Sequence, residues 1–238
     1  MLGSYREHAP PTGLRDVVAC LWENDHVRHH PQLVVPDGCV DLVWFGERGL
    51  KVVGADTGPH TVAPVGSTVT GIRLRPGAAG SVLGLPASEV RDTTVDLSEP
   101  WGADAEAFAG VMAEATPARR LGLLTRQVRG RHGVPDRLVV AAAAALSRPS
   151  ARVADVAADL GVSERQLRRR TLVAIGYGPK MLARVARLRR LIALPGQELA
   201  VRAALAGYAS QAHMTEEVHR LTGSTPVRFL EDATLTAA

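Results

Sequence analysis

Two short glycine-centred units constrain the fold of this chain more than any other feature. In each, a short Ala-rich helical pattern ends at a glycine, Gly161 or Gly207, and a serine soon afterwards is placed to begin a second helix. Glycine tolerates the positive φ of a tight turn, and serine is a preferred N-cap residue. The sequence therefore predicts two helix-turn-helix units in the C-terminal half of the chain.

The first unit covers residues 153–170, and we expect its second helix, capped by Ser163, to continue to about Ile175. Ala157 is small enough for the point where the two helices cross. Helical spacing gives the second helix an inner side made of Leu167, Thr171 and Ala174. Its opposite side carries Arg165, Arg168 and Arg169. Because arginine pairs with guanine in the major groove, we predict that these three arginines contact bases.

The second unit covers residues 199–223, with a second helix that begins after Ser210. Its predicted inner side consists of Met214, Val218 and Leu221. The outer side and the exposed start of the helix carry Ala212, Glu216 and four candidate base-contacting residues, which are Gln211, His213, Thr215 and His219.

A spacer helix over 179–194, opened by Pro179, is predicted between the two units. At 1.5 Å per residue it would be about 24 Å long, which suits two recognition helices in successive major grooves about 34 Å apart. Its apolar side contains Leu182, Val185, Leu188 and Ile192. The predicted phosphate contacts, three of which lie on its other side, are Arg170, Lys180, Arg184 and Arg187.

Charge is distributed unevenly along the chain. The net charge is only +4, but residues 1–132 hold 13 Lys and Arg against 15 Asp and Glu, whereas residues 133–238 hold 15 against 9. Arginine supplies 26 of the 28 positive charges. A basic C-terminal half indicates a polyanion partner, and we expect duplex DNA.

The N-terminal half has a different pattern. Apolar runs rich in Val, Thr and aromatic residues between closely spaced Gly and Pro predict strands within 33–45, 51–59 and 67–77. Helices are predicted over 103–115, 117–128 and 136–147, with a linker over 129–135. We therefore expect an α+β domain over 1–130, β-rich with two trailing helices, followed by an all-α domain over 134–238.

Alternation along residues 39–44 places Asp41 on one side of its strand and Trp44 on the other. Asp41 and Arg73 are candidates to line a ligand cavity, with Trp44 and Arg75 nearby. A structural Asp–Arg pair across neighbouring strands is the alternative interpretation.

No metal, cofactor or catalytic role is expected. The residues Cys20, His26, His29, His30 and Cys39 do not have the spacing of a zinc site. The sequence has no recognisable nucleophile motif, glycine-rich phosphate loop or paired-acid motif. It also lacks an apolar run long enough to cross a membrane, and its start does not resemble a signal peptide, so we expect a cytoplasmic protein.

The C-terminal half resembles the DNA-binding domain of bacterial AraC-family transcriptional regulators. The resemblance rests on segments 163–191 and 205–230, with the landmarks G-Y-x-P at 176–179, Arg187-Leu188 and G-x-T-P at 223–226. Upstream, PDGCVDLVW (36–44), residues 73–90 and Trp101-Gly102 resemble the N-terminal domain of one AraC-like subgroup. The resemblance implies a DNA-binding transcription regulator.

Three positions depart from the wider family. Thr171 and Val218 stand where the family usually has phenylalanine, so each recognition helix lacks an aromatic core residue. Glu216 stands on the DNA-facing side, where many relatives have a basic residue. The second unit is therefore expected either to bind phosphate weakly or to use Glu216 as an acceptor for a cytosine amino group.

Three hypotheses for the N-terminal half follow. It binds a small-molecule effector, or it has no ligand and serves as a homodimerisation or RNA-polymerase contact module. The third hypothesis, a DNA-modifying or repair domain, is disfavoured because the cysteine-rich metal cluster of alkyl-transfer repair fusions is missing.

Overall fold

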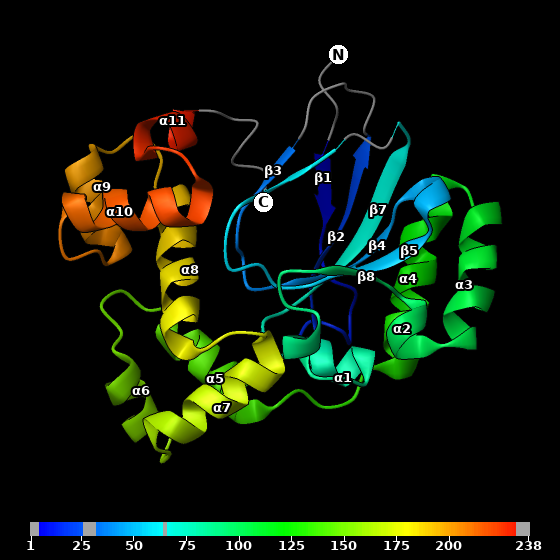
Figure 1. Cartoon of the computed structure of the whole chain (residues 1–238), viewed down its shortest axis with the longest axis horizontal. Coiled ribbons are helices and arrows are strands. Elements are labelled where there is room, and N and C mark those ends of the chain that lie inside the picture. Colours follow the sequence, from blue (N-terminus) through cyan, green and yellow to red (C-terminus); the bar gives the residue numbers. More distant parts are fainter. Residues whose placement is uncertain (1–4, 26–31, 64–65, 232–238) are drawn as a thin grey trace.

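The computed structural model describes residues 5–25, 32–63 and 66–231. Two parts lie beside each other in Figure 1: a sheet with helices, and a wholly helical part around a long central helix, α8. This architecture confirms the predicted β-rich N-terminal and all-α C-terminal fold classes. Among the described residues, no helix combines the length and apolar character needed to span a bilayer.

The main sheet is antiparallel and has the strand order β1-β2-β7-β4-β5-β8. A small second sheet pairs β3 with β6. The strands are β1 (Tyr5–His8), β2 (Val18–Asp25), β3 (Gln32–Val34), β4 (Val40–Trp44), β5 (Leu50–Val53), β6 (His60–Val62), β7 (Thr68–Leu74) and β8 (Thr94–Asp96).

The apolar run predicted over 33–45 forms two strands instead of one. Pro36, Asp37 and Gly38 interrupt it, and Gly38 has a φ of 84°, so β3 and β4 belong to different sheets. Strands β1, β2, β6 and β8 lie outside the predicted strand segments.

Helices cover one face of the main sheet. The alternation of β4 turns Val40, Leu42 and Trp44 toward this side, where they join a buried cluster with residues of α3 and α4. The helical elements of the N-terminal part are η1 (Gly46–Arg48), α1 (Ala79–Leu83), η2 (Ala87–Glu89), α2 (Ser98–Trp101), α3 (Ala103–Glu114) and α4 (Pro117–Arg131).

The C-terminal part contains the helices α5 (Arg137–Leu146), α6 (Val153–Asp159), α7 (Glu164–Ile175), α8 (Pro179–Ile192), α9 (Leu199–Ala206), α10 (Gln211–Thr222) and α11 (Pro226–Glu231). Helix α4 continues through Gly130 to Arg131, so the connection to α5 is shorter than the predicted linker. One continuous buried cluster also runs from the sheet into α5, α6, α7 and α8. The proposed division at 130–134 stays a prediction.

Candidate DNA interface and ligand cavity

The first helix-turn-helix unit has the predicted local structure. Gly161 adopts a φ of 66° in the turn. The Ser163 side chain accepts a hydrogen bond from the Gln166 backbone, and the Gln166 side chain accepts one from the Ser163 backbone at 2.9 Å. This capping box fixes where α7 begins. Ala157 is buried between the helices, as expected for the crossing point.

Helix α7 separates its apolar and basic sides. Leu167, Thr171 and Ile175 are buried, and Ala174 packs against the core from a half-buried position. The side chains of Arg165, Arg168 and Arg169 are exposed and border a shallow hollow with Gln166 and Leu172. This arrangement leaves the three predicted base-reading arginines accessible to a duplex.

The second unit repeats this design at the other end of α8, as Figure 1 shows. The Ser210 hydroxyl caps α10 by accepting from the backbone of His213 at 3.1 Å. Met214, Val218 and Leu221 are fully buried. The residues that α10 exposes include Gln211, Thr215, Glu216 and His219.

Glu217 of α10 has a buried carboxylate that the sequence did not predict as part of the site. It contacts basic side chains of both α8 and α10. Its side chain is 7% exposed and lies 2.8 Å from Arg187, 3.2 Å from Arg184 and 3.2 Å from His213. Burial alone would raise the pKa of Glu217, but the hydrogen bonds and charge of Arg187 hold that pKa below its ordinary value. The spacing of His213 and Glu217 by one helical turn was the available sequence signal.

Three residues that were predicted to contact DNA are the partners of Glu217 within the protein. His213 is turned back toward Glu217, accepts from the backbone of Ala209 and meets the ring of Tyr208 edge-on. Arg187 lies over the same Tyr208 ring and is mostly buried, whereas Arg184 is half-exposed. Contacts of His213, Arg184 and Arg187 with DNA stay predictions, and each would share its side chain with Glu217.

Arg170 also has a partner within the protein. It binds both carboxylate oxygens of Asp136, with distances of 2.6 and 2.8 Å. Asp136 in turn caps α5 by accepting from the backbones of Leu138 and Val139. Arg170 therefore joins α7 to α5, while Lys180 at the start of α8 remains exposed. A phosphate contact by Arg170 stays a prediction.

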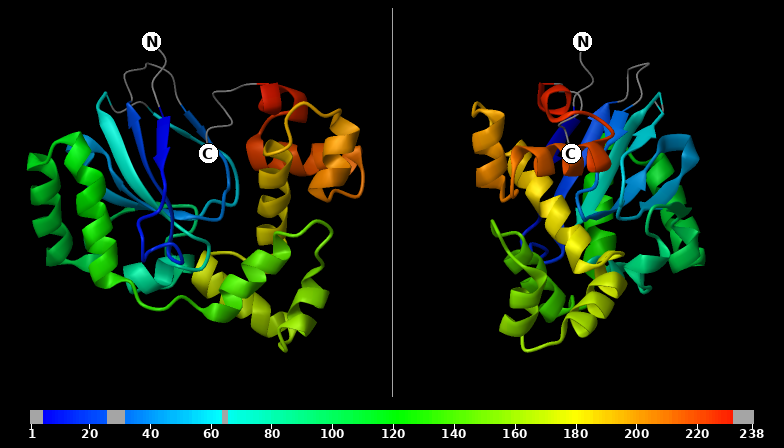
Figure 2. Two further views of the ribbon diagram at one scale, coloured as in Figure 1. Left: turned by 180° about the vertical axis from the view of Figure 1, so that it is seen from behind. Right: turned by 60° about the vertical axis from the view of Figure 1, so that its left-hand side comes forward.

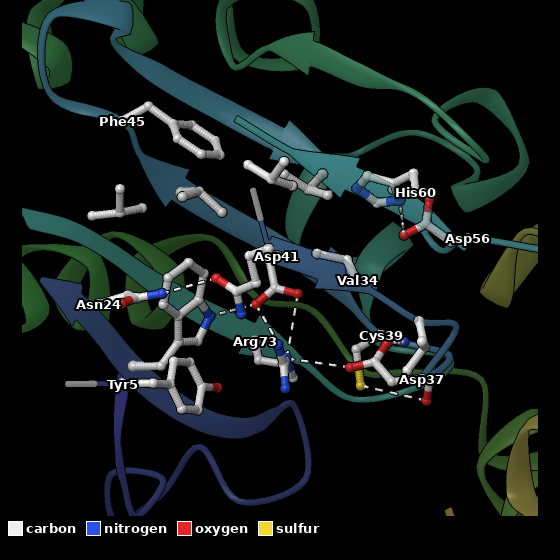
Figure 3. A pocket seen from close by; sticks show the side chains of 18 residues that line it. Tyr5, Asn24, Val34, Asp37, Cys39, Asp41, Phe45, Asp56, His60 and Arg73 are labelled. Carbon is white, nitrogen blue, oxygen red and sulfur yellow. Dashed lines mark hydrogen bonds and ion pairs between the residues drawn. The ribbon is translucent and has the colours of Figure 1, made fainter. Parts of the chain in front are cut away.

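A cavity of about 100 Å³ lies in the N-terminal part, lined by residues of both sheets (Figure 3). Its walls are largely apolar and include Val34, Val43, Val53, Val62 and Val69. The aromatic lining residues are Tyr5, Trp22 and Phe45, and the ionisable ones are Asp37, Cys39, Asp41, Asp56, His60 and Arg73.

Arg73 is the centre of the ionic group in this cavity. Strand register pairs Asp41 of β4 directly with Arg73 of β7, and the two side chains are 3.3 Å apart. The Asp37 carboxylate is also 3.3 Å from Arg73, and the Trp22 indole donates to Asp41 at 2.6 Å. Asp41 and Arg73 thus line the cavity and also form the cross-strand pair.

Asp56 and His60 form a second polar group on the cavity wall, 3.2 Å apart. Burial, helped by the negative charges of Asp37 and Asp92, raises the pKa of Asp56 to about 7. Burial also lowers the pKa of His60, so its imidazole is mainly neutral at pH 7. At neutral pH, Asp56 is therefore partly protonated and has a neutral partner.

Two predicted ligand residues do not line the cavity. Trp44 points to the helix-covered side of β4, because it lies an odd number of positions from Asp41. Arg75 follows the end of β7, is exposed, and donates to the carbonyl of Arg15 at 2.7 Å. Tyr5, Trp22, Phe45, Asp56 and His60 were missed, because only the folded sheets bring them to one space.

Neither cysteine takes part in a candidate metal site. Cys20 and Cys39 are free and buried. Within the described part of the chain, no group of His, Cys, Asp and Glu is arranged to hold a metal ion. The histidines at 26, 29 and 30 lie outside the described residues.

Comparison with known families matches both halves of the chain. Residues 156–232 match the family described as a helix-turn-helix domain. Residues 6–96 match a domain of unknown function, DUF6597. No curated protein matches the chain in sequence.

Similar solved structures include three of ToxT from Vibrio cholerae. One ToxT structure has 11% sequence identity and a TM-score of 0.47, and the match covers 99% of each chain. An apo lysine-to-alanine variant has 10% identity and a TM-score of 0.47, covering 89% of this chain and 96% of that one. A wild-type ToxT with bound unsaturated fatty acid has 9% identity and a TM-score of 0.45, covering 90% and 94%.

Proposed function

Because this chain is an AraC-family DNA-binding regulator with a helix-turn-helix domain over residues 156–232, we propose that it reads a bipartite duplex site through α7 and α10. The observation that carries this proposal is the placement of two capped recognition helices at opposite ends of α8 (Figure 2). Each of the two helices also has an exposed polar side. Helix α8 has 14 residues and is about 21 Å long at 1.5 Å per residue. The two recognition helices can then occupy successive major grooves of one duplex.

The two units contribute differently to this reading. Arg165, Arg168 and Arg169 contact base edges from α7, while Gln211, Thr215 and His219 offer shorter polar contacts from α10. Lys180 and the exposed edge of Arg184 neutralise phosphates between the units. The first unit therefore supplies most of the affinity, since Glu216 adds a negative charge to the exposed side of the second.

Selection of bound sequences from a random duplex pool tests sequence-specific DNA binding and identifies the bound site in the same experiment. We expect one enriched sequence with two boxes, and a binding constant that falls steeply with salt concentration as counterions are released. Recovery of unenriched sequences would overturn sequence-specific reading. A salt-independent binding constant would overturn the phosphate contacts.

We further propose that the cavity binds a small effector with a cationic group and a short apolar portion. Among the described residues that line it, Asp37, Asp41 and Asp56 are carboxylates, whereas Arg73 is the one guanidinium. Arg73 already binds two of these carboxylates. Among the residues that the structure describes, the one ion-pair partner of Asp56 is His60, whose imidazole is mainly neutral. A bound ammonium would therefore stabilise the ionised form of Asp56, while the valines enclose an alkyl chain.

The thermal unfolding of the full chain with n-butylamine or butyrate tests the charge of the effector, because the two probes have similar chains and opposite charges. We expect n-butylamine to raise the melting temperature and Asp56→Asn to remove that rise. Stabilisation by butyrate alone would overturn the cationic assignment. If neither probe acts, the cavity proposal fails in this form, and solution mass and polymerase binding then test the ligand-independent alternative.

A further inference from the structure

The connection between β3 and β4 lines the cavity and contacts both the joint that follows the first helix-turn-helix unit and the core of the second unit. The connecting segment, defined as residues 33–39 so that it includes the last two residues of β3, contains the Pro-Asp-Gly-Cys sequence at 36–39. Asp37 and Cys39 line the cavity. On other sides, Val35 and Gly38 contact the C-terminal part of the chain.

Gly38 lies against Tyr177, which connects the first recognition helix to α8. A Cβ atom placed on Gly38 would lie only 2.9 Å from the Tyr177 hydroxyl. Tyr177 is 3% exposed, and within the described residues its hydroxyl has no hydrogen-bond partner. It stands between Gly176, the C-cap of α7, and the start of α8 at Pro179. Any displacement of Tyr177 therefore acts at the joint between α7 and α8.

Val35 reaches the second unit from the same segment. It is 3% exposed and belongs to the buried cluster that also contains Leu188 of α8 and Met214 of α10. Leu33 packs against that cluster from a half-buried position. Within a few residues, the segment thus contacts the joint of the first unit and the core of the second.

Asp37 fixes the conformation of the segment from the cavity side. Its Oδ1 accepts from the backbone N–H of Cys39 at 2.8 Å, and its carboxylate is 3.3 Å from Arg73. If a bound molecule changed the contacts of Arg73, it would therefore also change the ion pair between Arg73 and Asp37. Asp37 directly precedes Gly38, so this change would lie next to the contact between Gly38 and Tyr177.

We propose that the connecting segment positions the two recognition helices relative to each other and couples this arrangement to occupancy of the cavity. The proposal rests on the proposed DNA-binding function. It assigns Gly38 and Tyr177 as positioning residues, which act on DNA through the orientation of α7 and α8. Both recognition helices can engage one duplex only when their separation and orientation match successive grooves.

Gly38→Ala in the full chain tests the contact, and Gly13→Ala is its matched control. Both glycines have a φ of 84°, but a Cβ atom on Gly13 would meet nothing within 4 Å. The two alanine variants therefore share the strain of a positive φ and differ in the contact. Tyr177→Phe removes the hydroxyl that the new methyl group would meet, so the Gly38→Ala/Tyr177→Phe double variant is the rescue.

Affinity is measured for the selected two-box duplex and for a duplex that carries only the box read by α7. We expect Gly38→Ala to weaken two-box binding about tenfold, which corresponds to roughly 1.4 kcal/mol, while single-box binding changes less than about twofold. Gly13→Ala should retain wild-type affinity, and the double variant should recover most of the loss. Thermal unfolding of each variant establishes that the folded protein is being compared.

Equal two-box affinities for Gly38→Ala and Gly13→Ala, or no recovery in the double variant, would overturn the positioning role. If Gly38→Ala does not fold, Asp37→Asn tests the same segment from the cavity, and unchanged two-box affinity in that variant would overturn the coupling. Failure of the wild-type chain to bind any duplex would instead contradict the proposed function, so the two failures are distinguishable.

Discussion

Arg187 of α8 and Glu217 of α10 form a two-point ion pair, with Nη2 2.8 Å from Oε1 and Nε 3.0 Å from Oε2. The pair links α10, the second recognition helix, to the spacer helix α8. An arginine predicted to bind phosphate thus takes part in the packing of the domain.

Glu217→Gln should lower the free energy of unfolding by about 1–3 kcal/mol, because it leaves Arg187 without a charged partner in a largely buried place. The pKa of Glu217 is held low, so its stabilising effect is present above the ordinary glutamate pKa and is lost as the pH falls through the lower, folded-state value. Urea unfolding at pH 7 measures the loss. The matched control is Glu216→Gln, whose pair with Arg220 is exposed and should contribute less than about 1 kcal/mol. Equal effects of the two substitutions would contradict the prediction.

Arg168→Ala should weaken binding to the selected duplex by roughly 1–3 kcal/mol and relax sequence preference at one base pair, because the exposed Arg168 is placed to read a base edge. Binding to a set of single-base variants of the duplex measures both effects. Arg119→Ala removes an exposed arginine on α4 and should leave affinity unchanged. If Arg168→Ala weakens binding to every sequence equally, Arg168 is a phosphate contact.

Glu216→Arg should tighten general DNA binding, since it replaces a negative charge on the exposed side of α10 with a positive one. The substitution also releases Arg220, which lies 2.8 Å from Glu216. Titrations of a non-specific duplex at several salt concentrations should show a salt slope steeper by about 0.9 for each new phosphate contact. Glu114→Arg on α3 provides the same charge change away from the recognition helices. An unchanged or larger dissociation constant for Glu216→Arg at fixed salt would count against this prediction.

Asp56→Asn should stabilise the protein more at pH 8 than at pH 5. The pKa of Asp56 is about 7 when folded and near 3.9 in an unfolded chain, so the folded state binds the proton more tightly between these values. The contribution of Asp56 to stability is therefore present below pH 4 and is lost as the pH rises through 7. The measurement is the difference in melting temperature between Asp56→Asn and the wild type at pH values from 5 to 8. Because His60 is present in both proteins, its own titration largely cancels in this difference. A difference that does not change with pH would contradict the assignment.

Local signals in the sequence determined both helix-turn-helix units. Helical spacing separated buried Leu167 from exposed Arg168, and serine and glycine marked the helix ends. These properties depend on residues within a few positions of one another, so periodicity and capping preferences predict them. Alternation along β4 likewise placed Asp41 and Trp44 on opposite sides.

The tertiary structure alone decided which polar groups meet. Asp56 lies in a loop and Arg73 in a strand, yet both line one cavity. Glu217 forms an ion pair with Arg187 of another helix. The tertiary structure also brought Gly38 against Tyr177, far away in the sequence. Spacing along a single element shows which way a side chain points, but it does not show which distant element lies opposite. The sequence by itself therefore determined the two helix-turn-helix units, whereas the packing of the two parts determined the cavity, the ion pairs and the placement of the connecting segment.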